Sequence, residues 1–393
     1  MRMKKISRRI IKVLLILIAV LLVLWLIIFV SSKIRLKRDK SFLEEKGYSN
    51  LVSAGEYAVN VLNYGNENGK HRIIAMAGYG VPDSCITMRR MTAALETDNQ
   101  IIFIERAGYG VSDDTMQDMT VENIVEAYRT ALKNAGIKAP YVLMPHSIGG
   151  VYATYWENKY PEEIEAVAII DGTELQAVSP VEQDHEYNEV LLYHRLVKFG
   201  LGGTGNLLLK HFLPPKDWLS DDEQRAEYAM ALMTYDSRAL LSEKNHEVRN
   251  INTAWDSIVT NDIPKIYIST QYFTAEAIEA DGILTDEMID RLMSDRRELK
   301  AKLEEQYQNG EIPKDLYDEF LPELPKTEEE SRQMALEDML ETGKDYKQRI
   351  LLPYFEKIGN CEFVNLPGDH LIYEQKPEEC GKIIFDFIAK SGG

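Results

Sequence analysis

Cysteine is scarce in this chain of 393 residues, which has Cys85, Cys361 and Cys380 and no others. With three cysteines one must stay unpaired, so a disulfide framework of the kind that holds small secreted domains together is excluded. No cluster of cysteine and histidine has the spacing of metal ligands, and no phosphate-binding loop is present. Gly78 and Gly80 are not followed by a third glycine at the spacing of a dinucleotide-binding turn. We therefore expect neither a metal nor a cofactor.

Positive charge is also in deficit, because 45 lysine and arginine residues face 63 aspartate and glutamate residues, a net charge of −18. Such a balance argues against a nucleic-acid partner. The hydrophobic content of 45% is ordinary for a globular enzyme of this length.

The basic residues gather at the N-terminus, on both sides of an apolar run over Ile10–Val30 that only Lys12 interrupts. About 20 such residues span the hydrocarbon core of a bilayer. A cleaved signal peptide is the alternative, but the run is long and has no clear small-x-small cleavage site, Val30-Ser31-Ser32 being the nearest. We expect a single-pass anchor in the cell membrane. The short basic N-terminus favours a catalytic domain outside the membrane, whereas the basic residues after the run favour the opposite orientation.

Short apolar runs alternate with amphipathic stretches of ten to fifteen residues along most of the chain. Runs typical of strands occupy 72–76, 101–104, 141–144, 166–170, 264–270 and 361–366, and helical patterns occupy 121–135, 151–160 and 377–389. Turns with glycine join them. This alternation predicts an α/β fold with a mostly parallel sheet and helices on both of its faces.

The most informative segment is 144–150, with the sequence MPHSIGG, between a strand and a helix. A serine between small residues at such a junction has the layout of a nucleophile elbow, in which a sharp turn exposes the hydroxyl of Ser147. The helix N-terminus behind it favours developing negative charge. By itself the pattern is weak evidence for a nucleophilic serine, because similar patterns arise by chance.

Three further segments strengthen it: 77–80 (AGYG) after an early strand, 105–113 (ERAGYGVSD) after the next, and 368–370 (GDH) after the last. Together they resemble the α/β-hydrolase family, in its branch of serine hydrolases similar to esterases and lipases. The first segment resembles the oxyanion loop, the second the Asp-Arg-x-Gly-x-Ser loop, and the third the turn of the catalytic histidine. The resemblance covers residues 50–180 and 355–393 well and the middle loosely. Pro145 stands where the family usually has glycine, and Ala77 where it often has histidine.

The resemblance implies that Ser147 attacks a carbonyl carbon, while His370 takes its proton and returns it to the leaving group. The backbone N–H groups of Tyr79 and Ile148 would hold the oxyanion. His370 is singled out among seven histidines because it follows a late strand, at the edge where such sheets carry their sites. His146 is expected to point elsewhere by strand alternation. The others are expected to be structural: His71, His185, His194, His211 and His246.

The acidic partner of the histidine is open at this point. The family usually places it after the strand 264–270, but the turn Gln271–Thr274 has no carboxylate. Asp171, at the end of the preceding strand, is the favoured candidate, since some family members use that position. A carboxylate between Glu276 and Asp286 is the second possibility, and no acid at all the third. In the plainer interpretation Asp171 is only a turn or capping residue.

The predicted organisation follows from these assignments. We expect an anchor over 1–32, a first part of the hydrolase core over 33–175, a helical cap over 176–262 and a core strand over 263–273. An acidic helical insertion over 274–350, divided near 322–325 (PELP), and the rest of the core over 351–393 complete the chain. The insertion is either a solvated extension without chemistry, or a second lid or docking surface for a protein partner.

These features favour a membrane-anchored serine hydrolase that cleaves a carboxylic ester through an acyl-enzyme intermediate. The substrate would be a small-molecule or lipid-like acyl compound. Peptidases, thioesterases and acyltransferases use the same groups, whereas a serine nucleophile argues against the haloalkane and epoxide branches, which attack with aspartate. The alternative from another class is a hydrolase fold without catalysis that binds a partner through its cap and insertion.

Overall fold

The apolar runs form a single sheet in the computed structural model, which describes residues 2–173, 176, 184–201, 213–321, 324, 325 and 327–391. Within these residues the strand order is β1-β2-β4-β3-β5-β6-β7-β8. The first two pairs in this order, β1–β2 and β2–β4, are antiparallel, and all later pairs are parallel. The strands are β1 (Leu51–Ser53), β2 (Ala58–Gly65), β3 (Arg72–Met76), β4 (Gln100–Ile104), β5 (Tyr141–Pro145), β6 (Ile164–Ile170), β7 (Lys265–Ser269) and β8 (Cys361–Asn365). The predicted α/β class, with a mostly parallel sheet, is confirmed.

Both faces of the central strands are apolar, because helices cover both faces of the sheet. Along β4, Ile102 and Ile104 belong to one hydrophobic core, whereas Ile101 and Phe103 belong to the other. Neighbouring side chains of a strand point to opposite faces, so a run without polar residues requires cover on each side.

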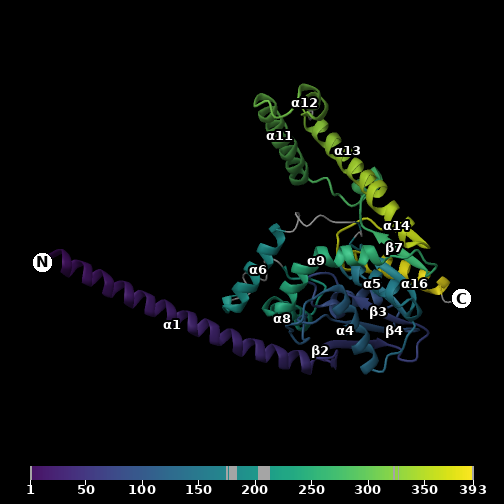
Figure 1. Ribbon diagram of the computed structural model, residues 1–393, viewed down its shortest axis with the longest axis horizontal. Coiled ribbons are helices and arrows are strands. Elements are labelled where there is room, and N and C mark those ends of the chain that lie inside the picture. The colour runs from purple at the N-terminus through teal and green to yellow at the C-terminus, as the bar shows by residue number, and fades with distance from the viewer. Residues whose placement is uncertain are drawn as a thin grey trace.

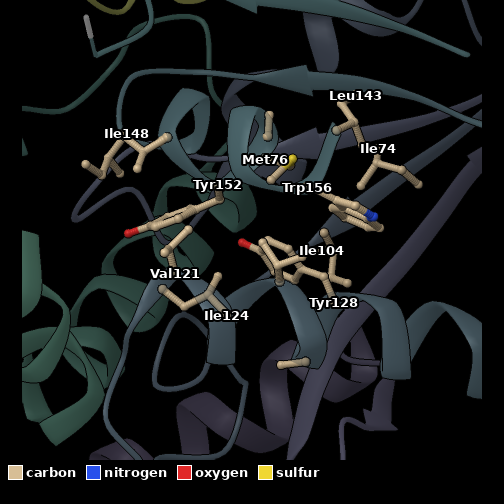
Figure 2. Close-up of a cluster of buried hydrophobic side chains, with 14 of the residues drawn as sticks. Ile74, Met76, Ile104, Val121, Ile124, Tyr128, Leu143, Ile148, Tyr152 and Trp156 are labelled. Atoms are coloured by element: carbon tan, nitrogen blue, oxygen red, sulfur yellow. The ribbon is translucent and has the colours of Figure 1, made fainter. Parts of the chain in front are cut away.

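Different helices cover the two faces. The first core takes residues from α4 (Val121–Asn134), α5 (Gly149–Lys159), α9 (Arg238–Ser257) and α14 (Leu352–Ile358). Figure 2 shows its centre, where Tyr128, Tyr152 and Trp156 of α4 and α5 lie in one cluster with Ile74 of β3 and Leu143 of β5. The second core takes residues from α2 (Ser84–Thr87), α3 (Arg89–Thr92), α8 (Asp221–Asp236), α15 (Ile372–Gln375) and α16 (Pro377–Ser391).

The N-terminal helix α1 (Arg2–Glu45) is far longer than the predicted anchor and continues without a break into the body. Its segment from Ile11 onward is long and apolar enough to cross a membrane, with a mean hydropathy that reaches 3.6. The boundary expected at residue 32 therefore falls inside a helix. At the far end of α1, Phe42 and Leu43 are buried in the second core.

Three α-helices in the expected cap region and four in the insertion are described, and a π-helix over Lys347–Leu351 follows the last of them. α6 (Asp184–Lys198), α8 and α9 lie beside the sheet, and α6 is on the side of the body that faces α1 (Figure 1). The insertion contains α10 (Ala275–Ala280), α11 (Asp286–Gln308), α12 (Lys314–Phe320) and α13 (Glu328–Tyr346). α11 and α13 run side by side as an arm that projects from the body (Figure 1), with Arg296 bonded to Asp338 between them. The break expected over 322–325 lies partly outside the described residues.

The burial of Leu43 predicts how firmly α1 is attached to the body. Leu43→Ala leaves a cavity in the second core and should lower the free energy of unfolding by about 2–5 kcal/mol. Leu51→Ala is the matched control, because Leu51 is 39% exposed and its truncation should change stability by less than about 0.5 kcal/mol. Thermal unfolding of the full chain in detergent measures both variants, and equal losses would show that α1 does not pack as described.

Candidate active site

Ser147 lies at a strained reversal of the chain between β5 and α5. Its φ of 53° falls in the left-handed region, which costs a residue with a side chain roughly 1–2 kcal/mol. Hydrogen bonds on both sides hold the turn: the Ser147 N–H donates to the Ile170 carbonyl at 3.3 Å, and the Ser147 carbonyl accepts from Thr173 N–H at 3.0 Å. The elbow is thereby fixed against the carboxyl end of β6. Strain held in this way is typical of functional sites.

Two glycines make room for the elbow. A Cβ on Gly149 would lie 2.7 Å from the Met76 carbonyl oxygen. A Cβ on Gly78 would lie 2.8 Å from His146 Nδ1 and 3.0 Å from Ser147 Cβ. The distances of 2.7 Å and 2.8 Å are too short for a real Cβ, so each position favours glycine. The Gly78 contact also places the loop after β3 directly against Ser147.

Asp171 and His370 are hydrogen-bonded to each other. The His370 Nδ1–H donates to Asp171 Oδ2 at 2.6 Å, and Thr270 N–H donates to Asp171 Oδ1 at 3.1 Å. The carboxylate is thus held from the end of β7, where the family usually carries the acid itself. Asp171 has a φ of 39°, so it also adopts a strained, left-handed conformation. A proton on Nδ1 leaves Nε2 of His370 free to accept another.

The competing acids are not placed at the histidine. Asp281 instead pairs with Lys376 Nζ at 2.7 Å and accepts a hydrogen bond from the Tyr272 hydroxyl at 3.0 Å. In the part of the chain that the structure describes, no carboxylate between Glu276 and Asp286 pairs with His370. Of the possibilities left open by the sequence, the structure brings Asp171 to the histidine.

His146 lies beside His370, and the expectation that it points elsewhere is wrong. Its Nε2–H donates to the His370 carbonyl at 2.9 Å, and the two ring centroids are 4.6 Å apart. Tyr373 packs edge-on against the same ring at 4.9 Å. Burial, with a smaller effect from His370, lowers the pKa of His146 to about 3, so the ring stays neutral. His146 therefore supports the backbone that carries His370 and adds no charge to it.

The loop that was expected to bind the oxyanion is held from behind by Arg106. Its guanidinium donates to the carbonyls of Ala77 and Gly78, each at 2.7 Å. The N–H of a trans peptide points opposite to its carbonyl, so fixing the Gly78 carbonyl directs the Tyr79 N–H away from Arg106. Among the described residues, neither Tyr79 N–H nor Ile148 N–H has a hydrogen-bond partner, so both amides are available.

Arg106 is completely buried and is itself held by the cap. Its Nε donates to Glu243 of α9 at 3.0 Å, and the Tyr152 hydroxyl of α5 donates to the other Glu243 oxygen at 2.5 Å. The guanidinium also lies over the ring of Tyr109 at 4.1 Å. A cap helix, the elbow helix and the loop after β3 are therefore joined through one buried ion pair.

Comparison with known proteins identifies the family. A family model described as the alpha/beta hydrolase fold matches residues 77–309, more than half of the chain. The chain belongs to the alpha/beta hydrolase fold family. The resemblance stated from the motifs is thereby confirmed.

Curated relatives match this chain over part of its length. The uncharacterized protein YbdG of Bacillus subtilis is 33% identical over 153 residues, which cover 39% of this chain and 46% of that protein. A cis-3-alkyl-4-alkyloxetan-2-one decarboxylase of Shewanella oneidensis is 27% identical over 28% of this chain and 36% of its own. The matched part is less than half of the length of these relatives.

Solved structures share the fold of this chain at low sequence identity. The haloalkane dehalogenase DatA of Agrobacterium tumefaciens aligns with a TM-score of 0.51 and 14% identity over 87% of this chain and 96% of that one. A putative lipase of Acinetobacter baumannii aligns with a TM-score of 0.50 and 15% identity over 92% and 96% of the two chains. At this identity the likeness shows the fold alone.

The sequence did not reveal two residues that shape this candidate site. Arg106 lies inside a motif that was recognised, but nothing in the motif says that its guanidinium binds the carbonyls of another loop. Glu243 is 137 residues from Arg106 and sits in an ordinary helical pattern. Burial of both partners is what makes the pair important, and burial is a property of the folded chain.

Because the Arg106–Glu243 pair is buried, removing one of its charges should strongly lower the free energy of unfolding. Glu243→Gln leaves the Arg106 guanidinium buried without a counter-charge and should lower the free energy of unfolding by about 3–5 kcal/mol. Glu122→Gln removes a carboxylate that pairs with Arg249 of α9 at 3.0 Å, and these two side chains are 36% and 50% exposed. This control should cost less than about 1 kcal/mol. Thermal unfolding measures the loss of stability in each variant, and similar losses in the two would contradict the role given to Glu243.

Proposed function

We propose that this protein is a membrane-anchored serine hydrolase that cleaves a carboxylic ester through an acyl-enzyme intermediate. Ser147 is the nucleophile, His370 the general base and Asp171 the acid that orients it. The observation that carries the proposal is the 2.6 Å hydrogen bond between His370 Nδ1 and Asp171, at the sheet edge to which the Ser147 elbow is tied.

The geometry supports a two-step reaction. His370 Nε2 takes the proton of the Ser147 hydroxyl as the oxygen attacks the carbonyl carbon, and Asp171 stabilises the imidazolium that forms. The N–H groups of Tyr79 and Ile148 receive the oxyanion of the tetrahedral intermediate. His370 then gives its proton to the leaving alkoxide, which departs as the alcohol. Water, activated by the same imidazole, hydrolyses the acyl-enzyme to the acid and restores Ser147.

A hydrolase fold without catalysis is less consistent with these contacts. Its main support was the missing carboxylate after Thr270, and Asp171 supplies a carboxylate to the same imidazole with Thr270 N–H behind it. Ser147 also keeps a backbone conformation that a purely structural turn does not require. Peptidase, thioesterase and acyltransferase activities remain chemically close, because each would use the same nucleophile, base and oxyanion donors.

The anchor in this proposal is α1. Side chains from Ile11 to Val30 are mostly exposed although they are apolar, and a bilayer is the solvent that such a surface fits. We place the catalytic domain outside the membrane, on the ground that the short basic N-terminus stays inside. A lipid-like acyl substrate suits an enzyme held at this position.

The roles of the three residues predict a graded loss of ester hydrolysis. With the full chain in detergent and a p-nitrophenyl ester, Ser147→Ala and His370→Ala should abolish turnover above background. Asp171→Asn should lower kcat by up to about 10⁴-fold, since the amide holds the imidazole in the wrong tautomer.

Asp281→Asn is the matched control for the acid, because Asp281 pairs with Lys376 away from the histidine. Its kcat should stay close to that of the unaltered protein. A loss in Asp281→Asn with normal turnover in Asp171→Asn would reverse the assignment, and full activity in Ser147→Ala would refute the proposal.

A further inference from the structure

The end of helix α6 contacts the apolar run of α1. The Trp25 indole N–H donates to the Phe199 carbonyl at 3.2 Å, directly after the last turn of α6. Gly200 lies so close to α1 that a Cβ there would be 3.0 Å from the Phe29 Cα. A part of the cap therefore touches the same helix that is apolar enough to cross a membrane (Figure 1).

This contact is held by the body rather than by α6 alone. Asp236, at the end of α8, pairs with Lys33 of α1 at 3.0 Å and lies 3.6 Å from Lys198 of α6. Val197 of α6 packs in a small apolar cluster with Leu36 of α1 and with Tyr228 and Leu232 of α8. Because α1, α6 and α8 meet at these residues, the depth of α6 relative to the membrane helix is fixed.

Helix geometry gives this depth. Trp25 precedes Val30, the last residue of the apolar run, by five residues, which is about 7.5 Å along an α-helix. A tryptophan at this distance from the end of a membrane span lies where aromatic side chains gather, at the boundary of hydrocarbon and headgroups. The Phe199 carbonyl, bonded to the indole of Trp25, must lie at the same level.

The outward face of α6 combines apolar and basic side chains, as the boundary between hydrocarbon and headgroups requires. Leu192 and Phe199, seven residues apart and hence on one side of the helix, are each 55% exposed. Exposed Arg195 and Lys198 lie beside them. Further along α1, exposed Lys37 and Lys40 line a cavity of about 470 Å³ together with Lys198 and the carboxylates of Asp113, Asp114 and Asp236. Among the described residues, neither Lys37 nor Lys40 has a carboxylate partner.

We propose that the C-terminal end of α6 is seated in the membrane interface, with Phe199 against acyl chains and the neighbouring lysines against the phosphates of anionic phospholipids. Apolar side chains bordered by basic ones bind such interfaces. This proposal rests on the proposed anchoring of the chain in the membrane by α1. It places one edge of the cap on the lipid, so that an acyl substrate dissolved in the bilayer reaches the hydrolase without crossing water.

The test replaces Phe199 by a photo-crosslinking phenylalanine analogue in the full chain, reconstituted into vesicles of phosphatidylcholine and phosphatidylglycerol with an alkyne-tagged phospholipid. Phe320 of α12 is the matched control, being 58% exposed but on the arm that projects from the body. Irradiation should tag the protein with lipid several-fold more at position 199 than at position 320. Equal tagging, or a full chain that fails to enter the vesicles, would overturn the proposal.

The crosslink needs no catalysis, so its outcome is independent of the proposed hydrolase activity. A second experiment links the membrane contact to the hydrolysis of lipid-borne substrates. Phe199→Glu should slow hydrolysis of a long-chain ester carried in the vesicles while leaving hydrolysis of a soluble short-chain ester unchanged. Phe320→Glu should change neither rate. Equal slowing of both esters by Phe199→Glu would indicate a disturbed fold and contradict a role specific to the membrane.

Discussion

The reversal of the chain at Ser147 is the constraint around which the site is built. Hydrogen bonds to the two neighbouring strands hold Ser147 in its left-handed conformation. The His146 N–H donates to the Met76 carbonyl of β3, and the Ser147 N–H donates to the Ile170 carbonyl of β6. These bonds continue the parallel pairing of β5 with its two neighbours past the end of the strand. The close approach of the elbow helix to β3 then requires glycine at position 149. The strain at one residue is thus offset by bonds from two adjacent strands.

The same edge of the sheet brings the other groups to the elbow. Asp171 follows β6, Thr270 follows β7 and His370 follows β8, and parallel strands end on the same side. Each residue is local to its own strand, and only the sheet makes them neighbours. The Arg106–Glu243 pair adds a contact of a different kind, because it is buried and charged. Removing one member leaves the other charge in the interior, so helix α9 and the loop after β3 depend on each other.

The central strands and the two best-marked site residues could be predicted from the sequence. The strand expected over 72–76 is β3 with the same bounds, because a short apolar run between polar turns has few alternatives. Ser147 and His370 stood in recognisable turns. Asp171 could only be favoured over other carboxylates, since its contact with His370 depends on how β6 and β8 lie on either side of β7.

Other features depend on tertiary contacts that no local pattern reports. β1 and β2 were not anticipated, and they pair antiparallel at the edge of the sheet, where pairing rather than composition defines a strand. His146 was expected to turn away because strand alternation was extended one residue beyond Pro145, the last residue of β5. The continuity of α1 into the body was missed because the end of the apolar run was taken as the end of the helix.

The central claim is that Ser147 is an activated nucleophile, and its most direct measurement is mass spectrometry of the full chain after reaction with a fluorophosphonate. The account predicts a single phosphonate adduct, mapped by proteolysis to the peptide that carries Ser147. That adduct should be lost when the protein is unfolded before treatment, because only the folded sheet places Ser147 and the Asp171–His370 pair at the same edge. A folded protein that gains no adduct, or gains it on another residue, would contradict the account.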